Sequence, residues 1–242
     1  MSCVSLDCMF RAQFGEDRAL WRLFRGQTTG YFVEVGAYDG VTLSNTWFLE
    51  QMGWTGLLVE PIPFMHQRAT IARPRSRVVH AACSRRGRGG TARFTIAGNV
   101  PVLSYLDADD EHIARCRREG AELVEVDVPV VTLSELLRRE RESPHEAGGP
   151  WRANGGWRID LVSIDTEGNE LDVLDGFDLE RFRPRVLVIE NDRPSGAAIE
   201  PYMTSRGYRR LHRQTINDFY VRSEGDEGLD LDGWNSGAAE AS

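Results

Sequence analysis

The chain has 242 residues, with 29 basic and 37 acidic side chains and a formal net charge of −8, a length that suits one α/β domain with a substantial core. The acidic balance argues against a protein that binds nucleic acid by neutralising phosphates. All 29 basic side chains are arginine, which excludes lysine Schiff-base chemistry and the phosphate-binding lysine of nucleoside triphosphatases.

Targeting and membrane signals do not stand out in the sequence. No stretch approaches the roughly 20 apolar residues of a membrane span, and the N-terminus lacks the basic and apolar regions of a secretory signal. The four cysteines, Cys3, Cys8, Cys83 and Cys116, form no CxxC pair, so zinc ribbons and thioredoxin-like sites are not indicated. We expect a cytoplasmic protein with free thiols and no membrane partner.

The first half of the chain alternates short apolar runs with amphipathic segments. Spacing and composition predict helices over residues 9–25, 43–52 and 104–119. Short apolar runs predict strands over residues 31–35, 57–61, 78–83 and 92–96. The N-terminal residues 1–29 would form a helical lead-in to the first strand.

The second half continues this alternation. Strands are predicted over residues 123–131, 161–165 and 186–190, with helices from Thr132 to about residue 141 and over residues 168–175. Segments 208–211 and 216–221 would form an antiparallel pair. The Gly- and Pro-rich residues 142–157 read as a long loop and candidate lid in which Trp151 or Trp157 stacks on a substrate, and residues 223–242 as an acidic, disordered tail.

These elements predict one α/β domain over residues 1–222. Its central sheet would be mostly parallel, with helices on both faces and an antiparallel C-terminal strand pair. Ligands bind such sheets beyond the carboxyl ends of the strands, so the residues at those ends are the candidate site.

A glycine turn follows the first predicted strand. Glu34 ends the strand, and Gly36 and Gly40 allow sharp turns and close approach of a ligand. Tyr38 stands where a dinucleotide-binding turn has its second glycine, and Glu34 would repel a pyrophosphate while suiting an ammonium group. Glu60 ends the second strand, where a carboxylate accepts hydrogen bonds from ribose hydroxyls. Together these residues favour S-adenosylmethionine over a phosphate-bearing cofactor, although Glu60 also fits a solvated position in an ordinary βαβ unit.

Carboxylates also end two later strands. Asp165 and Glu167 follow one strand, and Glu190 and Asn191 follow the next. Glu170 lies in the first turn of a helix, where negative charge compensates the helix dipole. Asp165, Glu190 and Asn191 are oxygen ligands that suit a divalent cation such as Mg²⁺, or they bind substrate hydroxyls directly.

The ordered set VEVGAYDG, SNT, GWTGLLVEP and IDLVSIDTEGNELDVLDGF resembles the FkbM-type methyltransferases. The resemblance runs from about residue 13 to residue 221, and the DxEGxE block is its most specific part. It implies a Rossmann-like class I methyltransferase fold, S-adenosylmethionine as donor, and O-methylation of a hydroxyl on a small molecule such as a natural product or a sugar. Thr166 departs from the family pattern, where an apolar residue is more usual.

The resemblance also assigns roles by position. The donor would be bound by Glu34, Gly36, Ala37, Tyr38, Asp39, Ser44, Asn45, Glu60, Pro61 and Asp165. Asp165, Glu167 and Glu190 would be the catalytic carboxylates, with Asp165 the first candidate for the general base.

Other interpretations remain open at this stage. An NAD-dependent oxidoreductase would also use Glu60, but Tyr38 and Glu34 disfavour it. A non-catalytic S-adenosylmethionine-binding module is the third interpretation. His80 is expected to be packed within a strand and His112 to lie on the surface of a helix, although His112 and His145 are each near enough to reach over the cleft. A buried structural Cys83 is favoured over a reactive thiolate.

Overall fold

A computed structural model describes residues 6–108, 110–143, 145, 148–150, 156–224 and 228–231 of the chain. A seven-stranded sheet forms its centre, in the order β3-β2-β1-β7-β8-β10-β9. Its strands are β1 (Tyr31–Val35), β2 (Thr55–Glu60), β3 (Ser76–His80), β7 (Leu161–Ile164), β8 (Val186–Glu190), β9 (Tyr208–Gln214) and β10 (Asn217–Arg222). The first five strands in this order are parallel, and β10 runs antiparallel to both β8 and β9. The predicted mostly parallel sheet and the predicted C-terminal hairpin are both confirmed.

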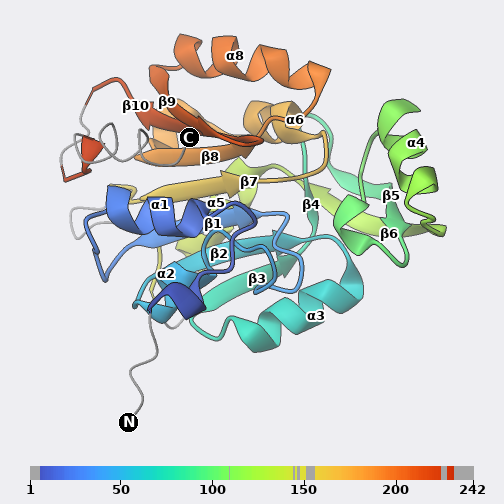
Figure 1. The fold of residues 1–242 in the computed structure, drawn as a ribbon, viewed down its shortest axis with the longest axis horizontal. Helices are drawn as coiled ribbons and strands as arrows, with labels where there is room; N and C mark the ends of the chain where they lie inside the picture. The colour runs from blue at the N-terminus through green and yellow to red at the C-terminus, as the bar shows by residue number, and fades with distance from the viewer. Residues whose placement is uncertain are drawn as a thin grey trace.

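Helices cover both faces of this sheet (Figure 1). On one face lie α5 (Leu133–Glu142), α6 (Glu170–Asp175), α7 (Leu179–Phe182) and α8 (Ile199–Ser205). On the other face lie α1 (Glu16–Leu23) and α2 (Trp47–Gln51), while α3 (Pro63–Ala72) packs against β2 and β3. Residues of β1 alternate between the two cores: Tyr31 and Val33 contact one helical layer and Phe32 the other. Burial on both faces explains why these strands are short and continuously apolar.

A second, three-stranded sheet of order β4-β6-β5 is inserted between β3 and α5. It comprises β4 (Ala82–Cys83), β5 (Gly90–Ala97) and β6 (Leu123–Val131). The 3-10 turn η2 (Pro101–Leu103) and α4 (Asp110–Arg118) connect β5 to β6. Figure 1 shows this sheet and α4 grouped at one end of the large sheet. The insertion therefore forms a wall at that end.

Several predicted boundaries are wrong. The strand expected over 78–83 is split at Ala81 into β3 and β4, which belong to different sheets. The helix expected over 9–25 is the 3-10 turn η1 (Leu6–Met9) and α1, separated by Gly15 at a φ of 86°. The helices expected over 43–52 and 104–119 are shorter in the structure, where they are α2 and α4. The sequence analysis missed α3, α7 and α8, since two of them are short and the apolar side chains of α3 do not gather on one side.

Half of the predicted loop over 142–157, including Trp151, and most of the predicted tail over 223–242 lie outside the described residues. Trp157 packs edge-on against Phe182, with ring centroids 4.6 Å apart, and contacts the core rather than lining a cavity. Within the tail, Leu229 is buried against the α1 layer and the Asp230 amide donates to the Leu23 carbonyl. Among the described residues, no helix combines the length and hydrophobicity that crossing a bilayer requires.

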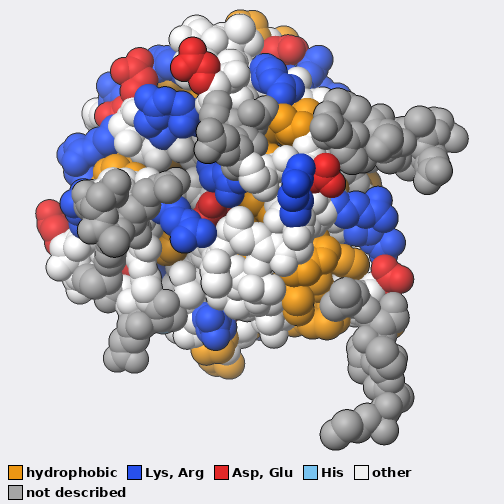
Figure 2. All heavy atoms as spheres, turned by 90° about the vertical axis from the view of Figure 1, so that its left-hand side faces the viewer, with side chains coloured by type: hydrophobic (Ala, Val, Ile, Leu, Met, Phe, Trp, Pro, Cys, Tyr) orange, Lys and Arg blue, Asp and Glu red, His pale blue; other side chains and the backbone are white. Residues whose placement is uncertain are grey.

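The remaining 3-10 turn, η3 (Pro194–Ala198), connects β8 to α8. A space-filling view of one face shows arginine and acidic side chains interspersed among small apolar areas (Figure 2). On that face, neither sign of charge forms a continuous patch of the kind that attracts a polyanion or a polycation.

Candidate active site

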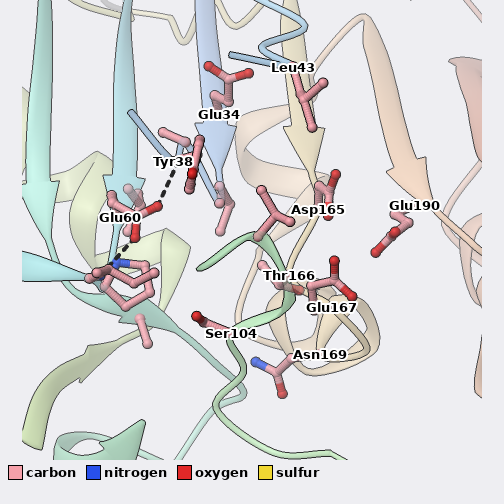
Figure 3. A pocket seen from close by; sticks show the side chains of 18 of the residues that line it. Glu34, Tyr38, Leu43, Glu60, Ser104, Asp165, Thr166, Glu167, Asn169 and Glu190 are labelled. Carbon is pink, nitrogen blue, oxygen red and sulfur yellow. Dashed lines mark hydrogen bonds between the residues drawn. The ribbon is translucent and has the colours of Figure 1, made fainter. Parts of the chain in front are cut away.

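A cavity of about 180 Å³ lies where β1, β2, β7 and β8 end (Figure 3). The inserted unit supplies its opposite wall through Phe94 and the Pro101–Leu106 segment. Of the predicted site residues, those that line it are Glu34, Gly36, Ala37, Tyr38, Ser44, Asn45, Glu60, Pro61, Asp165, Glu167 and Glu190. Asp39 and Asn191 are not among its lining residues.

The turn after β1 brings the backbone close to the neighbouring strand end. Gly36 has a φ of 86°, and a Cβ at this position would lie 1.8 Å from the Asp165 carbonyl oxygen. The amides of Gly36 and Ala37 both donate to the Val59 carbonyl at the end of β2. Tyr38 follows with a φ of 51°, so the predicted tight turn is present and tolerates a tyrosine in the left-handed region.

Glu60 holds this turn from the end of β2. Its Oε2 accepts a hydrogen bond from the Tyr38 amide, and its Oε1 one from the Ile62 amide, each at 2.7 Å. Burial raises the pKa of Glu60 to about 8, against the lowering effect of those two hydrogen bonds. The carboxylate is thus oriented by the protein at the cavity wall, and each oxygen keeps a further lone pair for a ligand hydroxyl.

Glu34 has a structural role that the sequence analysis does not predict. Its carboxylate is buried and accepts hydrogen bonds from the Ser44 hydroxyl, the Asn45 amide and the Thr46 hydroxyl at 2.7–3.0 Å. The buried guanidinium of Arg73 lies 3.4 Å away. The carboxylate therefore holds the Ser44–Thr46 segment and also lines the cavity, and this explains why the SNT block accompanies the glycine turn.

Asp39 also has a local structural role. Its Oδ1 accepts hydrogen bonds from the amides of Val41 and Thr42, and its Oδ2 one from the Thr42 hydroxyl. Such bonds are typical of an aspartate that caps a turn. Asp39 was expected to contact the donor, but it is not among the cavity-lining residues, and its hydrogen bonds shape the loop between Gly36 and Ser44.

Three carboxylates converge at the other end of the cavity. Each of Asp165, Glu167 and Glu190 offers an oxygen that lies within 4.8 Å of the others, and Figure 3 shows the three side chains directed toward a common region. Glu190 is buried, and its Oε2 has no hydrogen-bond partner among the described residues. Asp165 is open to the cavity.

Proximity and desolvation disfavour full ionisation of this group. The surrounding protein, and then the neighbouring negative charges, raise the pKa of Asp165, of Glu167 and most strongly of Glu190 above their ordinary values. Two close carboxylates relieve their repulsion by sharing a proton. The group can therefore exchange a proton near neutral pH.

Asn191 does not join the three carboxylates. Its Nδ2 donates to Asp218 at 2.6 Å, and its Oδ1 lies against the backbone of Gly196. The predicted ligand set of Asp165, Glu190 and Asn191 is therefore not assembled. Glu167 takes the third place in the group, because the strand ends at Glu190 and the chain then turns away.

Comparison with known proteins identifies the family of this chain. A family model described as the methyltransferase FkbM domain matches residues 34–210, a range that includes β1, β2, β7, β8 and the inserted unit. The chain belongs to the FkbM methyltransferase family. The curated methyltransferase sdnD from Sordaria araneosa is 32% identical over 140 residues, which cover 52% of this chain and 52% of that protein. This chain thus matches about half the length of that relative.

Two solved structures have a similar arrangement at low sequence identity. An O-methyltransferase from Bacillus cereus in complex with SAH covers 89% of this chain and 82% of its own, at 9% identity and a TM-score of 0.43. A TehB-like SAM-dependent methyltransferase from Corynebacterium glutamicum covers 90% of each chain, at 11% identity and a TM-score of 0.41.

The sequence analysis missed a group of FkbM-domain side chains around Glu167. Arg193 Nη2 lies 2.5 Å from Glu167 Oε2, and Arg115 Nη1 lies 3.8 Å from the same oxygen. His112, expected at the surface, is buried and contacts Arg193. These residues come from α4 and from the segment after β8, so no sequence pattern near Glu167 predicts that they lie beside it.

Glu170 and Cys83 also have defined places. Glu170 Oε1 accepts hydrogen bonds from the Thr166 amide, the Thr166 hydroxyl and the Gly168 amide, so it organises the DxEGxE turn rather than merely facing the helix dipole. The hydroxyl of Thr166 gives the departure from the family pattern a structural function. Cys83 lines the cavity but is buried, and desolvation raises the pKa of its thiol to about 12, which agrees with the expected structural cysteine.

Proposed function

We propose that the protein transfers a methyl group from S-adenosylmethionine to a hydroxyl oxygen of a small natural product or sugar. Membership of the methyltransferase family supports the class of reaction. The observation that carries the finer proposal is the convergence of Asp165, Glu167 and Glu190 beside the turn that would hold the donor. Transfer to an alcohol oxygen releases a proton, and these carboxylates can accept it.

The donor would occupy the half of the cavity formed by β1 and β2. Glu60 would accept hydrogen bonds from the two ribose hydroxyls, and Ile62, Phe94 and Leu106 offer apolar surface for the adenine. The backbone of Gly36 and Ala37 would approach the methionine part closely. The sulfonium would then lie near Asp165, where negative charge stabilises it.

Methyl transfer is an in-line displacement at the sulfonium methyl carbon. The acceptor oxygen forms a bond to this carbon while the carbon–sulfur bond breaks, and sulfur keeps the bonding pair and becomes a neutral thioether. The hydroxyl proton passes to Asp165, which shares the charge with Glu190. Holding the two reactants in line can contribute about 7–11 kcal/mol, and a positioned base about 10²–10⁴-fold in rate.

The acceptor would enter between Leu43 and the Pro101–Leu106 segment. Leu43 is 43% exposed and Val102 is 37% exposed, although both are large and apolar and both line the cavity. An acceptor placed there would cover these side chains and present its hydroxyl to Asp165. The three carboxylates below favour an uncharged acceptor over an anionic one.

A divalent cation is not part of this proposal. Glu167 already contacts Arg193 and lies near Arg115, and Asn191 is bonded elsewhere. The two guanidiniums also lie beside Asp192, so they face four carboxylates in all. About two negative charges remain, and one shared proton reduces them to one. The oxidoreductase interpretation is disfavoured for a different reason. The Tyr38 amide donates to the Glu60 carboxylate, so it is not available to bind a phosphate at the turn.

The proposal is tested in two stages. Calorimetric titration with S-adenosylmethionine should give binding that is lost or at least tenfold weaker in Glu60→Ala, with NADH giving none. The exposed Glu119→Ala is the matched control and should bind like the original protein. Binding of NADH, or donor binding indifferent to Glu60, would contradict the donor assignment.

The second stage supplies methyl-labelled S-adenosylmethionine with a panel of hydroxylated small molecules and identifies the methylated atom by mass spectrometry. Asp165→Asn should weaken donor binding less than Glu60→Ala does, and at saturating donor it should lose about 10²-fold or more in transfer rate. Transfer should persist in EDTA. Loss of transfer in EDTA and its recovery with Mg²⁺ would show that a cation is required, and an unaffected Asp165→Asn would remove the proposed base.

A further inference from the structure

Arg193 crosses the turn that carries Glu167. The arginine follows β8, and its side chain is only 11% exposed. It passes over Gly168, where a Cβ would lie 2.6 Å from Arg193 Nη1. Gly168 has a φ of 106° and Glu167 a φ of 57°, so both residues have positive φ angles. The guanidinium of Arg193 fills the space beside Gly168 that a side chain would otherwise occupy.

His112 holds the far side of the same guanidinium. Its Nδ1 lies 2.8 Å from Arg193 Nη2, and its Nε2 lies 2.9 Å from the Leu103 carbonyl oxygen. An arginine N–H donates and a carbonyl accepts, so these partners assign the tautomer with hydrogen on Nε2. The ring also packs edge-on against Tyr105 at 5.0 Å. His112 is therefore fixed by two hydrogen bonds and a ring contact.

Arg193, held in this way, also binds the carboxylate of Glu167. The same Nη2 that donates to His112 donates to Glu167 Oε2 at 2.5 Å. On its other edge, Arg193 Nε contacts Asp192 Oδ1 at 3.4 Å. A planar guanidinium held at both edges has little rotational freedom, so it defines the direction of the carboxylate that it binds.

We propose that Arg193 is a positioning residue, held in place by His112, that fixes the Glu167 carboxylate beside Asp165 and Glu190. The insertion between β3 and α5 would thus do more than form a wall of the cavity, because its helix α4 carries His112, which holds a side chain at the reacting end. The importance of this role for the reaction rests on the proposed methyl transfer. The contact chain itself is independent of donor and acceptor.

The test follows the titration of Glu167 in the full chain by carboxyl ¹³C NMR after labelling of glutamate, with Glu167→Gln to assign the resonance. Arg193→Gln should raise the midpoint of Glu167 by about one pH unit or more, because an adjacent positive charge favours the carboxylate. Arg193→Lys should recover part of the shift. His112→Leu should give an intermediate rise, because the guanidinium remains but is no longer held. Arg117→Gln, an exposed change on the same helix, should leave the midpoint unchanged.

A purely structural role makes a different prediction. Arg193→Gln would then lower the melting temperature while Glu167 titrates as in the original protein, and this result would overturn the proposal. If Arg193→Gln does not fold, Arg193→Lys and His112→Leu decide, and an unchanged midpoint in both would overturn it equally. The dissociation constant of Arg193→Lys for S-adenosylmethionine should equal that of the original protein within error, because Arg193 is not among the cavity-lining residues. Failure of methyl transfer and failure of this inference are therefore separate results.

Discussion

At the scale of single residues, Gly36 has the strictest steric requirement at the candidate site. A Cβ added at this position would lie 1.8 Å from the Asp165 carbonyl oxygen, and the φ of 86° is unfavourable for residues other than glycine. Gly36→Ala should therefore destabilise the protein by about 3 kcal/mol or more, since two backbone segments must separate. Urea unfolding measures this loss.

A matched glycine separates crowding from backbone preference. Gly87 has a φ of 78°, but no atom lies within 4 Å of its Cβ position. Gly87→Ala should cost only about 1–2 kcal/mol, the penalty of the left-handed conformation alone. Equal losses in the two variants would contradict the close approach of β1 to the end of β7.

Individual residues also show what the sequence can predict. Asp165 and Glu190 were placed correctly because a carboxylate directly after a buried strand must lie at the sheet edge, whatever surrounds it. Asn191 was misplaced because one further residue turns the side chain toward Asp218. His112 and Arg193 are 81 positions apart, and their contact depends on how the insertion folds back, which no local periodicity records.

At the scale of elements, one buried arginine joins α2, α3 and the turn after β1. Arg73 Nε contacts Glu50 Oε2 at 2.8 Å, Nη1 lies 3.4 Å from Glu34 Oε2, and Nη2 donates to the Thr46 hydroxyl. Arg73 and both carboxylates are almost completely buried. The arginine lies at the C-terminal end of α3, so it fixes that end of the helix against α2.

Arg73→Met should destabilise the protein by about 3–5 kcal/mol, because two buried carboxylates lose their cation. Arg75→Met is the matched control two residues away, since its guanidinium is exposed and donates to the Gly53 carbonyl. Chemical denaturation compares the two. A loss in Arg73→Met as small as that in Arg75→Met would contradict a stabilising role of the buried ion pairs of Arg73.

The elements explain why some predictions were better than others. The parallel strands and the capping box of Thr132 and Glu135 were predictable, because each depends on neighbouring residues. The boundary between β3 and β4 was not, because Val78 to Cys83 is one apolar run whose two halves pair with different sheets. Pairing partners are set by the whole fold, and the sequence pattern shows only that a strand is favoured.

At the scale of the whole molecule, buried acids determine how stability depends on pH. Desolvation raises the pKa of Glu60 to about 8, and it also raises the pKa values of Glu16 and Asp17 at the start of α1. The folded chain therefore holds protons that the unfolded chain releases. The free energy of unfolding should fall as pH rises from about 5 to about 8.

Thermal unfolding across this pH range at constant ionic strength checks the direction. The melting temperature should be lower at the alkaline end, and the slope should be smaller in Glu60→Gln, which cannot ionise. A melting temperature that rises steadily from pH 5 to pH 8 would mean that these carboxylates are stabilised as anions in the folded protein.

The two ends of the described chain meet beside the cavity. The Gln214 side chain hydrogen-bonds to the Phe14 carbonyl, and Asn217 Nδ2 donates to Glu16 Oε1 at 2.7 Å. Gln13 and Ile216, which flank these contacts, both line the cavity. During synthesis from the N-terminus, Phe14 and Glu16 would lack these partners until β10 leaves the ribosome. The pocket would therefore be complete only after β10 has been made, and chains released before that point would have no finished pocket.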